Sequence, residues 1–167
     1  YKITPPVFDI WMRLLQRVPD SVLWLLEDNS TASHNLRREA AQRGVAPERI
    51  VFAPRVSIQD HLARQRVADL FLDTLPVNAH TTASDALLVG LPVLTCTGNA
   101  FASRVAASLL HSIGLPELVC SNLADYEQRA LRLATVPDAL ASVKSRLTHN
   151  RNAYPLFDAQ RLCRHIE

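Results

Sequence analysis

The sequence is poor in glycine, with only Gly44, Gly90, Gly98 and Gly114 among its 167 residues. They can build neither the G-x-G-x-x-G turn of classical dinucleotide-binding proteins nor the G-x-x-x-x-G-K-[ST] loop of P-loop enzymes. The G-x-S-x-G turn of serine hydrolases is also missing, and no pair of carboxylates has the pattern of a glycosidase acid and base. The sequence therefore excludes these enzyme classes.

Cysteine is scarce too, and Cys96, Cys120 and Cys163 are widely spaced. An odd count without a C-x-x-C pair or neighbouring histidines predicts reduced thiols in a cytoplasmic protein, with no metal and no cofactor. The chain lacks both a signal-peptide pattern and the run of about 20 apolar residues that a membrane span needs. The formal net charge is +2 and the cations are scattered, so neither a membrane nor a nucleic acid is an expected partner.

Hydrophobic residues make up 48% of the chain, enough for the core of one domain. Short apolar runs, rich in Val, Leu and Ile, predict parallel strands that are buried on both faces. These runs are 21–27, 50–54, 69–74, 92–97 and 117–120. Between and after them, amphipathic spacing and capping residues predict helices. The predicted helices are 5–18, 33–43, 57–66, 81–89, 100–112, 122–135, 137–150 and a last one from 155.

Strands that alternate with helices predict an α/β fold with a doubly wound, Rossmann-like parallel sheet and a helical C-terminal tail. Ligands of such sheets bind beyond the carboxyl ends of the strands, here the loops after Leu26, Pro54, Thr74 and Thr97. The chain opens on a helix with no strand beside it. We therefore expect a central strand upstream, with residues 1–167 forming one lobe of a longer polypeptide.

The segment 73–95 has the order strand, loop, helix start, helix, turn and strand. Thr81 and Thr82 fall where the first free backbone N–H groups of a helix emerge, which with two hydroxyls predicts an anion site that fits a diphosphate. Asp85 follows one turn later on the same face, where a carboxylate can accept ribose hydroxyls. His80 can donate to a phosphate. The alternative is that Thr81 only caps the helix and Asp85 only complements its dipole.

Other residues gain meaning only from their surroundings. His61 and Arg64 share one face of the predicted 57–66 helix, where they can contact a base or remain a solvated surface pair. Lys2 can neutralise phosphate charge, although a single lysine near a terminus carries little information.

The chain resembles the C-terminal catalytic lobe of O-GlcNAc transferases and their SPINDLY-like relatives over nearly its whole length. The resemblance is carried by YKITPPVFDIWMRLLQRVPDSVLWLL, ADLFLDTLPVNAHTTASDALLVGLPVLT, FASRVAASLL and DYEQRALRL. It implies the donor lobe of a two-lobed GT-B enzyme, which transfers a sugar from a nucleotide diphosphate, UDP-GlcNAc above all, to Ser or Thr of a protein. Transfer would proceed with inversion and without a metal.

The same resemblance implies roles for single residues. It assigns the diphosphate to Lys2, His80, Thr81 and Thr82, the ribose to Asp85, and the uridine region to His61 and Arg64. It also implies an N-terminal lobe and, in many members, tetratricopeptide repeats upstream. One position departs from the family, because Ile58 stands where O-GlcNAc transferases place a lysine near the nucleoside. SPINDLY-type members use GDP-fucose and other relatives use UDP-glucose.

Two further functions are compatible with the residues. A sugar-nucleotide epimerase of the same fold would share the diphosphate helix but would not use a protein acceptor. A non-enzymatic α/β nucleotide-binding or scaffold module would have helix caps that only look like a site.

Overall fold

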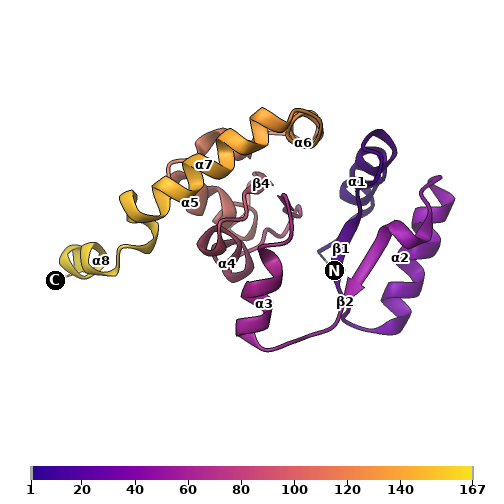
Figure 1. Cartoon of the computed structure of the whole chain (residues 1–167), viewed down its shortest axis with the longest axis horizontal. Coiled ribbons are helices and arrows are strands. Elements are labelled where there is room, and N and C mark those ends of the chain that lie inside the picture. Colours follow the sequence, from indigo (N-terminus) through magenta and orange to yellow (C-terminus); the bar gives the residue numbers. More distant parts are fainter. Residues whose placement is uncertain (1, 167) are drawn as a thin grey trace.

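The computed structural model describes residues 2–166, which form an α/β arrangement of parallel strands alternating with helices (Figure 1). The strands are β1 (Leu23–Leu26), β2 (Ile50–Ala53), β3 (Phe71–Leu72), β4 (Val93–Cys96) and β5 (Val119–Cys120). The helices are α1 (Pro5–Arg17), α2 (Ser30–Gln42), α3 (Ile58–Gln65), α4 (Thr81–Val89), α5 (Val105–Ser112), α6 (Leu123–Thr135), α7 (Pro137–Ala153) and α8 (Ala159–Ile166). Single 3-10 turns occupy Pro47–Arg49, Phe101–Ser103, Pro116–Leu118 and Pro155–Phe157.

The strands form two hydrogen-bonded sheets. In one, β1 pairs in parallel with β2 and places Leu23 opposite Ile50. In the other, β4 lies between β3 and β5, with parallel pairing on both sides. Over residues 2–166 no ladder joins β1 to β3, so the sheet that the sequence predicts as one body is present in two pieces. All four β4 residues are buried, as predicted for a strand covered on both faces.

Most element boundaries follow the predicted ones, and α4 follows them at both ends. Gly90 and Gly114 have φ values of +90° and +71°, the left-handed conformation that ends a helix and suits glycine. The predicted 100–112 helix is wrong at its start, because Phe101–Ser103 is a 3-10 turn and α5 begins only at Val105. There the Ser103 hydroxyl donates to the Ala100 carbonyl and accepts from the Ala100 N–H, which holds the chain in the tighter turn.

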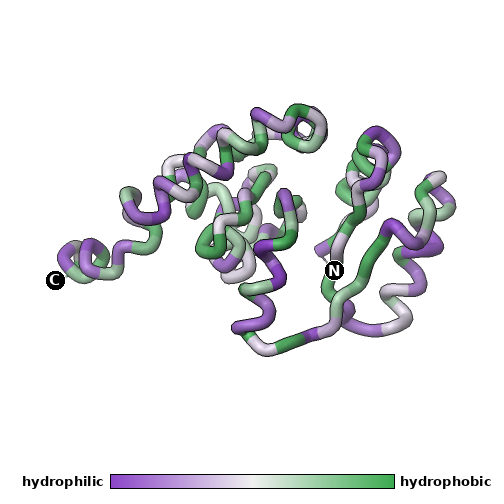
Figure 2. The backbone as a smooth tube through the Cα atoms, in the orientation of Figure 1, coloured by the Kyte–Doolittle hydropathy of each residue, from purple (hydrophilic) through white to green (hydrophobic). Residues whose placement is uncertain are grey.

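Two other predicted boundaries change for local reasons. Helix α2 begins at Ser30 rather than at residue 33, because the Asn29 side chain accepts the Ala32 N–H and acts as its N-cap. The tail from residue 155 starts as a 3-10 turn, and α8 extends away from the body of the molecule (Figure 1). Strands β1 and β2 are largely hydrophobic, while α2 is largely hydrophilic (Figure 2). Over residues 2–166, every helix is too short or too polar to cross a bilayer.

Helices α1 and α6 pack against each other and join the two sheets. Trp11 and Tyr126 are both buried, and the Trp11 Nε1–H donates to the Tyr126 hydroxyl at 3.2 Å. That hydroxyl donates in turn to the backbone carbonyl of Asp73, just beyond β3, at 2.9 Å. At the surface, Arg13 forms a bidentate pair with Glu127, which lowers the pKa of that carboxyl. One buried hydroxyl therefore links three segments that are distant in sequence.

We expect Tyr126→Phe to lower the free energy of unfolding by about 1–3 kcal/mol, because it leaves the buried Trp11 N–H and Asp73 carbonyl without their partner. Urea unfolding measures this loss. Tyr154→Phe is the control, since Tyr154 lies at the surface and should lose less than about 0.5 kcal/mol. Equal effects of the two substitutions would contradict a special role for the Tyr126 hydroxyl.

Candidate functional site: the loop before helix α4

Helix α4 begins with an open N-terminus. The N–H groups of Ala83 and Ser84 both bond to the His80 carbonyl, so only those of Thr81 and Thr82 remain free, with no acceptor within residues 2–166. His80 is the N-cap residue, but its side chain does not cap the helix. Both threonines are exposed. The predicted anion site is therefore accessible, with two N–H donors and two hydroxyls at the positive end of a helix.

The loop that leads into α4 is organised by the buried side chain of Asp73, which is only 3% exposed. Its Oδ1 accepts the N–H groups of Thr74 (2.8 Å) and Ala79 (2.7 Å), and its Oδ2 accepts the Thr95 hydroxyl (2.6 Å). Burial raises the pKa of this carboxyl, and these hydrogen bonds partly offset the rise. Sequence reasoning missed Asp73 as a site residue, although a polar residue directly after a buried strand is a usable signal.

Asn78 adds further hydrogen bonds to this loop, and its backbone holds Lys2 beside the loop. The fully buried Asn78 side chain donates to the Thr74 carbonyl at 2.8 Å, and the backbone N–H of Asn78 donates to the Ala102 carbonyl. The backbone carbonyl of Asn78 accepts a hydrogen bond from the Lys2 ammonium at 3.0 Å. The structure thus places Lys2 against the loop that ends in His80.

His80 lies beside a second loop, at the end of β4. Its Nε2 is 3.4 Å from the Ala102 carbonyl, a weak contact that a better acceptor can replace. Phe101 meets the imidazole edge-on, with ring centroids 6.1 Å apart, and is 80% exposed. Asp85 lies further along α4, partly exposed, with no hydrogen bond or ion pair within residues 2–166. His80 and Asp85 are therefore both available to a ligand.

The predicted pair on α3 is also formed, with partners that sequence reasoning missed. Arg64 Nη2 lies 3.2 Å from His61 Nδ1, and Arg64 Nη1 donates to the Pro54 carbonyl at 2.6 Å. The guanidinium carbon is 5.9 Å from the centre of the Trp24 ring on β1. Gln65 contacts the other nitrogen of His61 at 2.8 Å.

Helix α3 packs against α4, but no hydrogen bond joins the α3 pair to Thr81, Thr82 or Asp85 within the described range. Ile58, the first residue of α3, is 62% exposed. The predicted residues thus form two groups on adjacent helices: one at the start of α4 and one on α3.

The described residues contain no group of three or more His, Cys, Asp or Glu side chains that could hold a metal. Cys96 and Cys120 are buried free thiols, although they are register partners on β4 and β5. Burial raises the pKa of the Cys120 thiol to about 12, so it is not a nucleophile at neutral pH.

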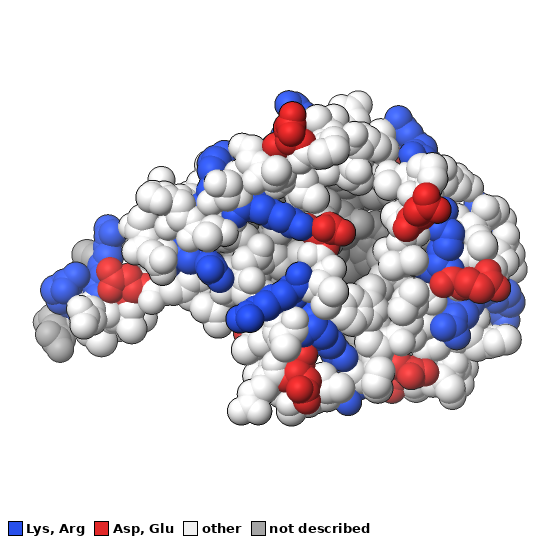
Figure 3. All heavy atoms as spheres, viewed as in Figure 1, with Lys and Arg blue, Asp and Glu red and all other residues white. Residues whose placement is uncertain are grey.

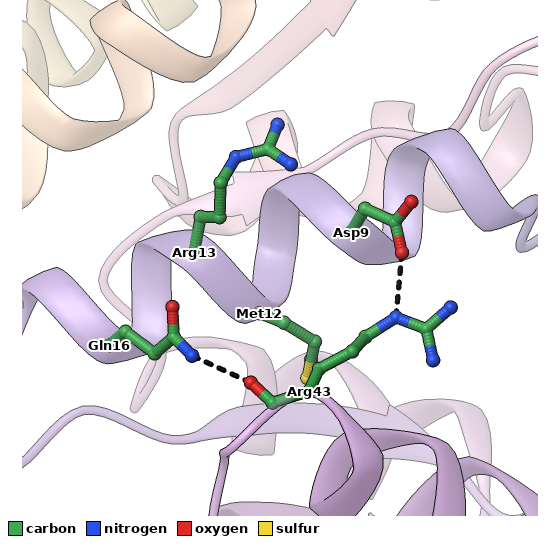
Figure 4. A pocket seen from close by; sticks show the side chains of 5 residues that line it. All are labelled: Asp9, Met12, Arg13, Gln16 and Arg43. Carbon is green, nitrogen blue, oxygen red and sulfur yellow. Dashed lines mark hydrogen bonds and ion pairs between the residues drawn. The ribbon is translucent and has the colours of Figure 1, made fainter.

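Acidic and basic side chains are mixed over the surface seen in Figure 3, without a patch of one sign. This face is hollowed near its middle, between the part that carries α1 and α2 and the part that carries α4 to α7 (Figure 3). A separate shallow hollow of about 240 Å³ on α1 is lined by Asp9, Met12, Arg13, Gln16 and Arg43 (Figure 4). It is smaller than the roughly 300–1,000 Å³ of ordinary ligand pockets, and its Arg43 is already paired with Asp9. We therefore assign it no ligand.

Residues 1–166 match the model of glycosyl transferase family 41. The chain is 38% identical over its whole length to the UDP-N-acetylglucosamine--peptide N-acetylglucosaminyltransferase of Caenorhabditis elegans, and spans 14% of that protein. It also superposes on a solved mutant O-GlcNAc transferase of Thermobaculum terrenum, with a TM-score of 0.88 and 33% identity. That match covers 95% of this chain and 31% of the other.

The Asp73→Asn variant tests the buried carboxylate. Burial raises the folded-state pKa above the ordinary value of 3.8, so Asp73 favours folding below that value and loses this contribution as pH rises through its folded-state pKa. Asparagine does not ionise, so the variant does not lose stability in this pH range. Its oxygen can still accept the N–H groups of Thr74 and Ala79, and its amide can donate to the Thr95 hydroxyl. We expect the stability of Asp73→Asn relative to the unmodified protein to rise between about pH 3.5 and 7, as measured by urea unfolding.

Asp69→Asn is the matched control, since Asp69 lies at the surface with an 80% exposed side chain. Its stability difference should not follow the same trend. Asp73→Ala, which leaves all three donors unpaired, should cost more than about 2 kcal/mol at any pH. A pH-independent difference for Asp73→Asn would show that burial does not raise the pKa.

Proposed function

Because this chain belongs to glycosyl transferase family 41, we propose that it is the donor-binding lobe of an enzyme that transfers N-acetylglucosamine from UDP-GlcNAc to protein hydroxyls. The observation that carries the proposal is the open start of α4, with the free N–H groups of Thr81 and Thr82 and with Lys2 held against the same loop. Relatives named for this reaction support the choice of donor.

In the proposed reaction, an acceptor hydroxyl oxygen attacks the anomeric carbon of the sugar while the bond from that carbon to the diphosphate oxygen breaks. The bonding electrons leave with UDP, so negative charge grows on the diphosphate. Thr81, Thr82 and the Lys2 ammonium stabilise this charge, and His80 adds a donor. Because these groups are in place before reaction, stabilisation needs little rearrangement and no metal ion.

The nucleoside of the donor is assigned to the two helices beyond the diphosphate. Asp85 accepts the ribose hydroxyls one turn after Thr81, and its carboxylate is not engaged by another described residue. His61 and Arg64, on the neighbouring α3, contact the base. The sugar is transferred with inversion, because a single displacement occurs at the anomeric carbon.

The acceptor Ser or Thr, and the group that removes its proton, are assigned to the rest of the enzyme. The chain spans only 14% of the Caenorhabditis elegans relative and 31% of the Thermobaculum terrenum chain. We propose that residues 1–167 form one lobe of a two-lobed enzyme, with tetratricopeptide repeats as a further partner. Free Cys96 and Cys120 on adjacent strands fit a reducing cytoplasm.

The variant Thr81→Ala plus Lys2→Ala, made in the intact protein, tests the diphosphate assignment. Charge-assisted hydrogen bonds contribute about 1.5–3 kcal/mol each, so we expect UDP affinity measured by calorimetry to fall at least tenfold. The matched control is Thr148→Ala plus Lys144→Ala on α7, which should leave affinity unchanged. Unchanged UDP binding by the first variant would refute the assignment.

An activity assay separates the proposed transferase from the two other functions. Transfer to protein predicts that UDP release from UDP-GlcNAc depends on an acceptor protein. Release that is independent of acceptor would indicate an epimerase-like enzyme, and binding without any release would indicate a binding module.

A further inference from the structure

Both ring nitrogens of His61 are engaged, and the chemistry of their partners determines which nitrogen carries the proton. Arg64 Nη2 lies 3.2 Å from Nδ1, and a guanidinium can only donate. Nδ1 must therefore accept for this contact to be a hydrogen bond. In the neutral ring, the single proton then sits on Nε2.

The Nε2–H group needs an acceptor, and its neighbour is the side-chain amide of Gln65 at 2.8 Å. The amide presents either oxygen or nitrogen after half a rotation, with almost no change in shape. The structure has the amide nitrogen facing the ring and leaves the amide oxygen without a partner. In that orientation His61 Nε2 would have to accept, and the ring proton would point at the Arg64 guanidinium. Only with the Gln65 oxygen facing the ring are both contacts hydrogen bonds.

The surroundings make this arrangement rigid. Gln65 is 9% exposed, and its buried oxygen has no hydrogen-bond partner among residues 2–166 as the amide is placed. Half a rotation of the amide gives this oxygen the His61 Nε2–H as its donor. Arg64 is fixed from two further sides, by the Pro54 carbonyl at 2.6 Å and by the face of the Trp24 ring. Both nitrogens of the imidazole are thus occupied.

We infer that Gln65 is a positioning residue for nucleobase recognition: it locks His61 in the Nε2–H tautomer and, through His61, fixes Arg64. The inference rests on the proposed function, which brings the base of the donor to α3. Gln65 itself is buried and does not touch the nucleotide. Its effect is preorganisation, since a planar base meets a ring and a guanidinium that are already held in place.

Nuclear magnetic resonance of the intact protein, with ¹⁵N only in the histidine rings, tests the tautomer. The His61 signals are identified by their loss in His61→Ala. We expect a protonated Nε2 and an unprotonated Nδ1 at neutral pH. Gln65→Met, which keeps the length but removes the acceptor, should give a mixture of tautomers, whereas Gln65→Glu should keep the Nε2–H form.

Calorimetry then links the tautomer to recognition, with UDP and pyrophosphate as probes. Gln65→Met should weaken UDP binding by about fivefold, the loss expected for one net hydrogen bond, and leave pyrophosphate binding unchanged. Gln65→Glu should restore UDP binding to within about twofold. Gln42→Met, on an exposed residue at the end of α2, is the matched control and should bind both probes normally.

The outcomes separate the inference from the proposed function. A proton on Nδ1 in the unmodified protein overturns the lock, whatever the protein binds. An intact lock, with UDP affinity unchanged in Gln65→Met, overturns the role of Gln65 in recognition. An intact lock in a protein that does not bind UDP at all overturns the proposed function and leaves the tautomer assignment supported.

Discussion

The carboxylate of Asp73 lies at the carboxyl edge of β3, and the geometry of the candidate site depends on its burial. Removing a charge from water is costly unless donors replace the lost hydration, and here two backbone N–H groups and the Thr95 hydroxyl do so in part. These bonds fix both ends of the loop that leads to α4. The Asp73 carbonyl also accepts the Tyr126 hydroxyl, which Trp11 contacts from α1. One residue therefore joins the core to the start of α4.

The same loop leads into a helix start that no side chain caps, which distinguishes α4 from α2, α3 and α6. Helices α2, α3 and α6 are capped by the side chains of Asn29, Ser57 and Asn122, each of which accepts an N–H of the first turn. At α4 the cap position is His80, whose side chain makes no such bond. Helices α1, α5 and α7 also lack a side-chain cap, but proline occupies the first turn of α1 and α7, and a 3-10 turn leads directly into α5. A capping Ser or Asn at residue 80 would satisfy the helix but compete with the ligand.

Local sequence determined the elements well, and the long-range contacts poorly. Thr81–Val89 was predicted at both ends because a polar start, an apolar stripe and a terminal glycine all lie within eleven residues. The start of α5 was missed because a single serine side chain favours the 3-10 turn. His80, Thr81 and Thr82 were proposed as site residues from helix-end chemistry. Asp73 and Gln65 were not, since their roles come from partners that only the folded chain places beside them.

The candidate site relies on nearby hydrogen-bond donors rather than on the overall charge of the protein. This determines which kind of anion it suits. A net charge of +2 with mixed surface charges gives little long-range attraction for an anion. Under the proposed function, affinity for a diphosphate would come from short-range donors: the α4 N–H groups, two hydroxyls and Lys2, which a carbonyl of the same loop holds in place. Such donors would bind a ligand tightly only if its acceptor atoms match their positions. A ligand that only carries charge would gain little affinity. His61 and Arg64 lie on a different helix from Thr81 and Thr82, so under the proposed function a nucleoside diphosphate would contact both groups and pyrophosphate only one.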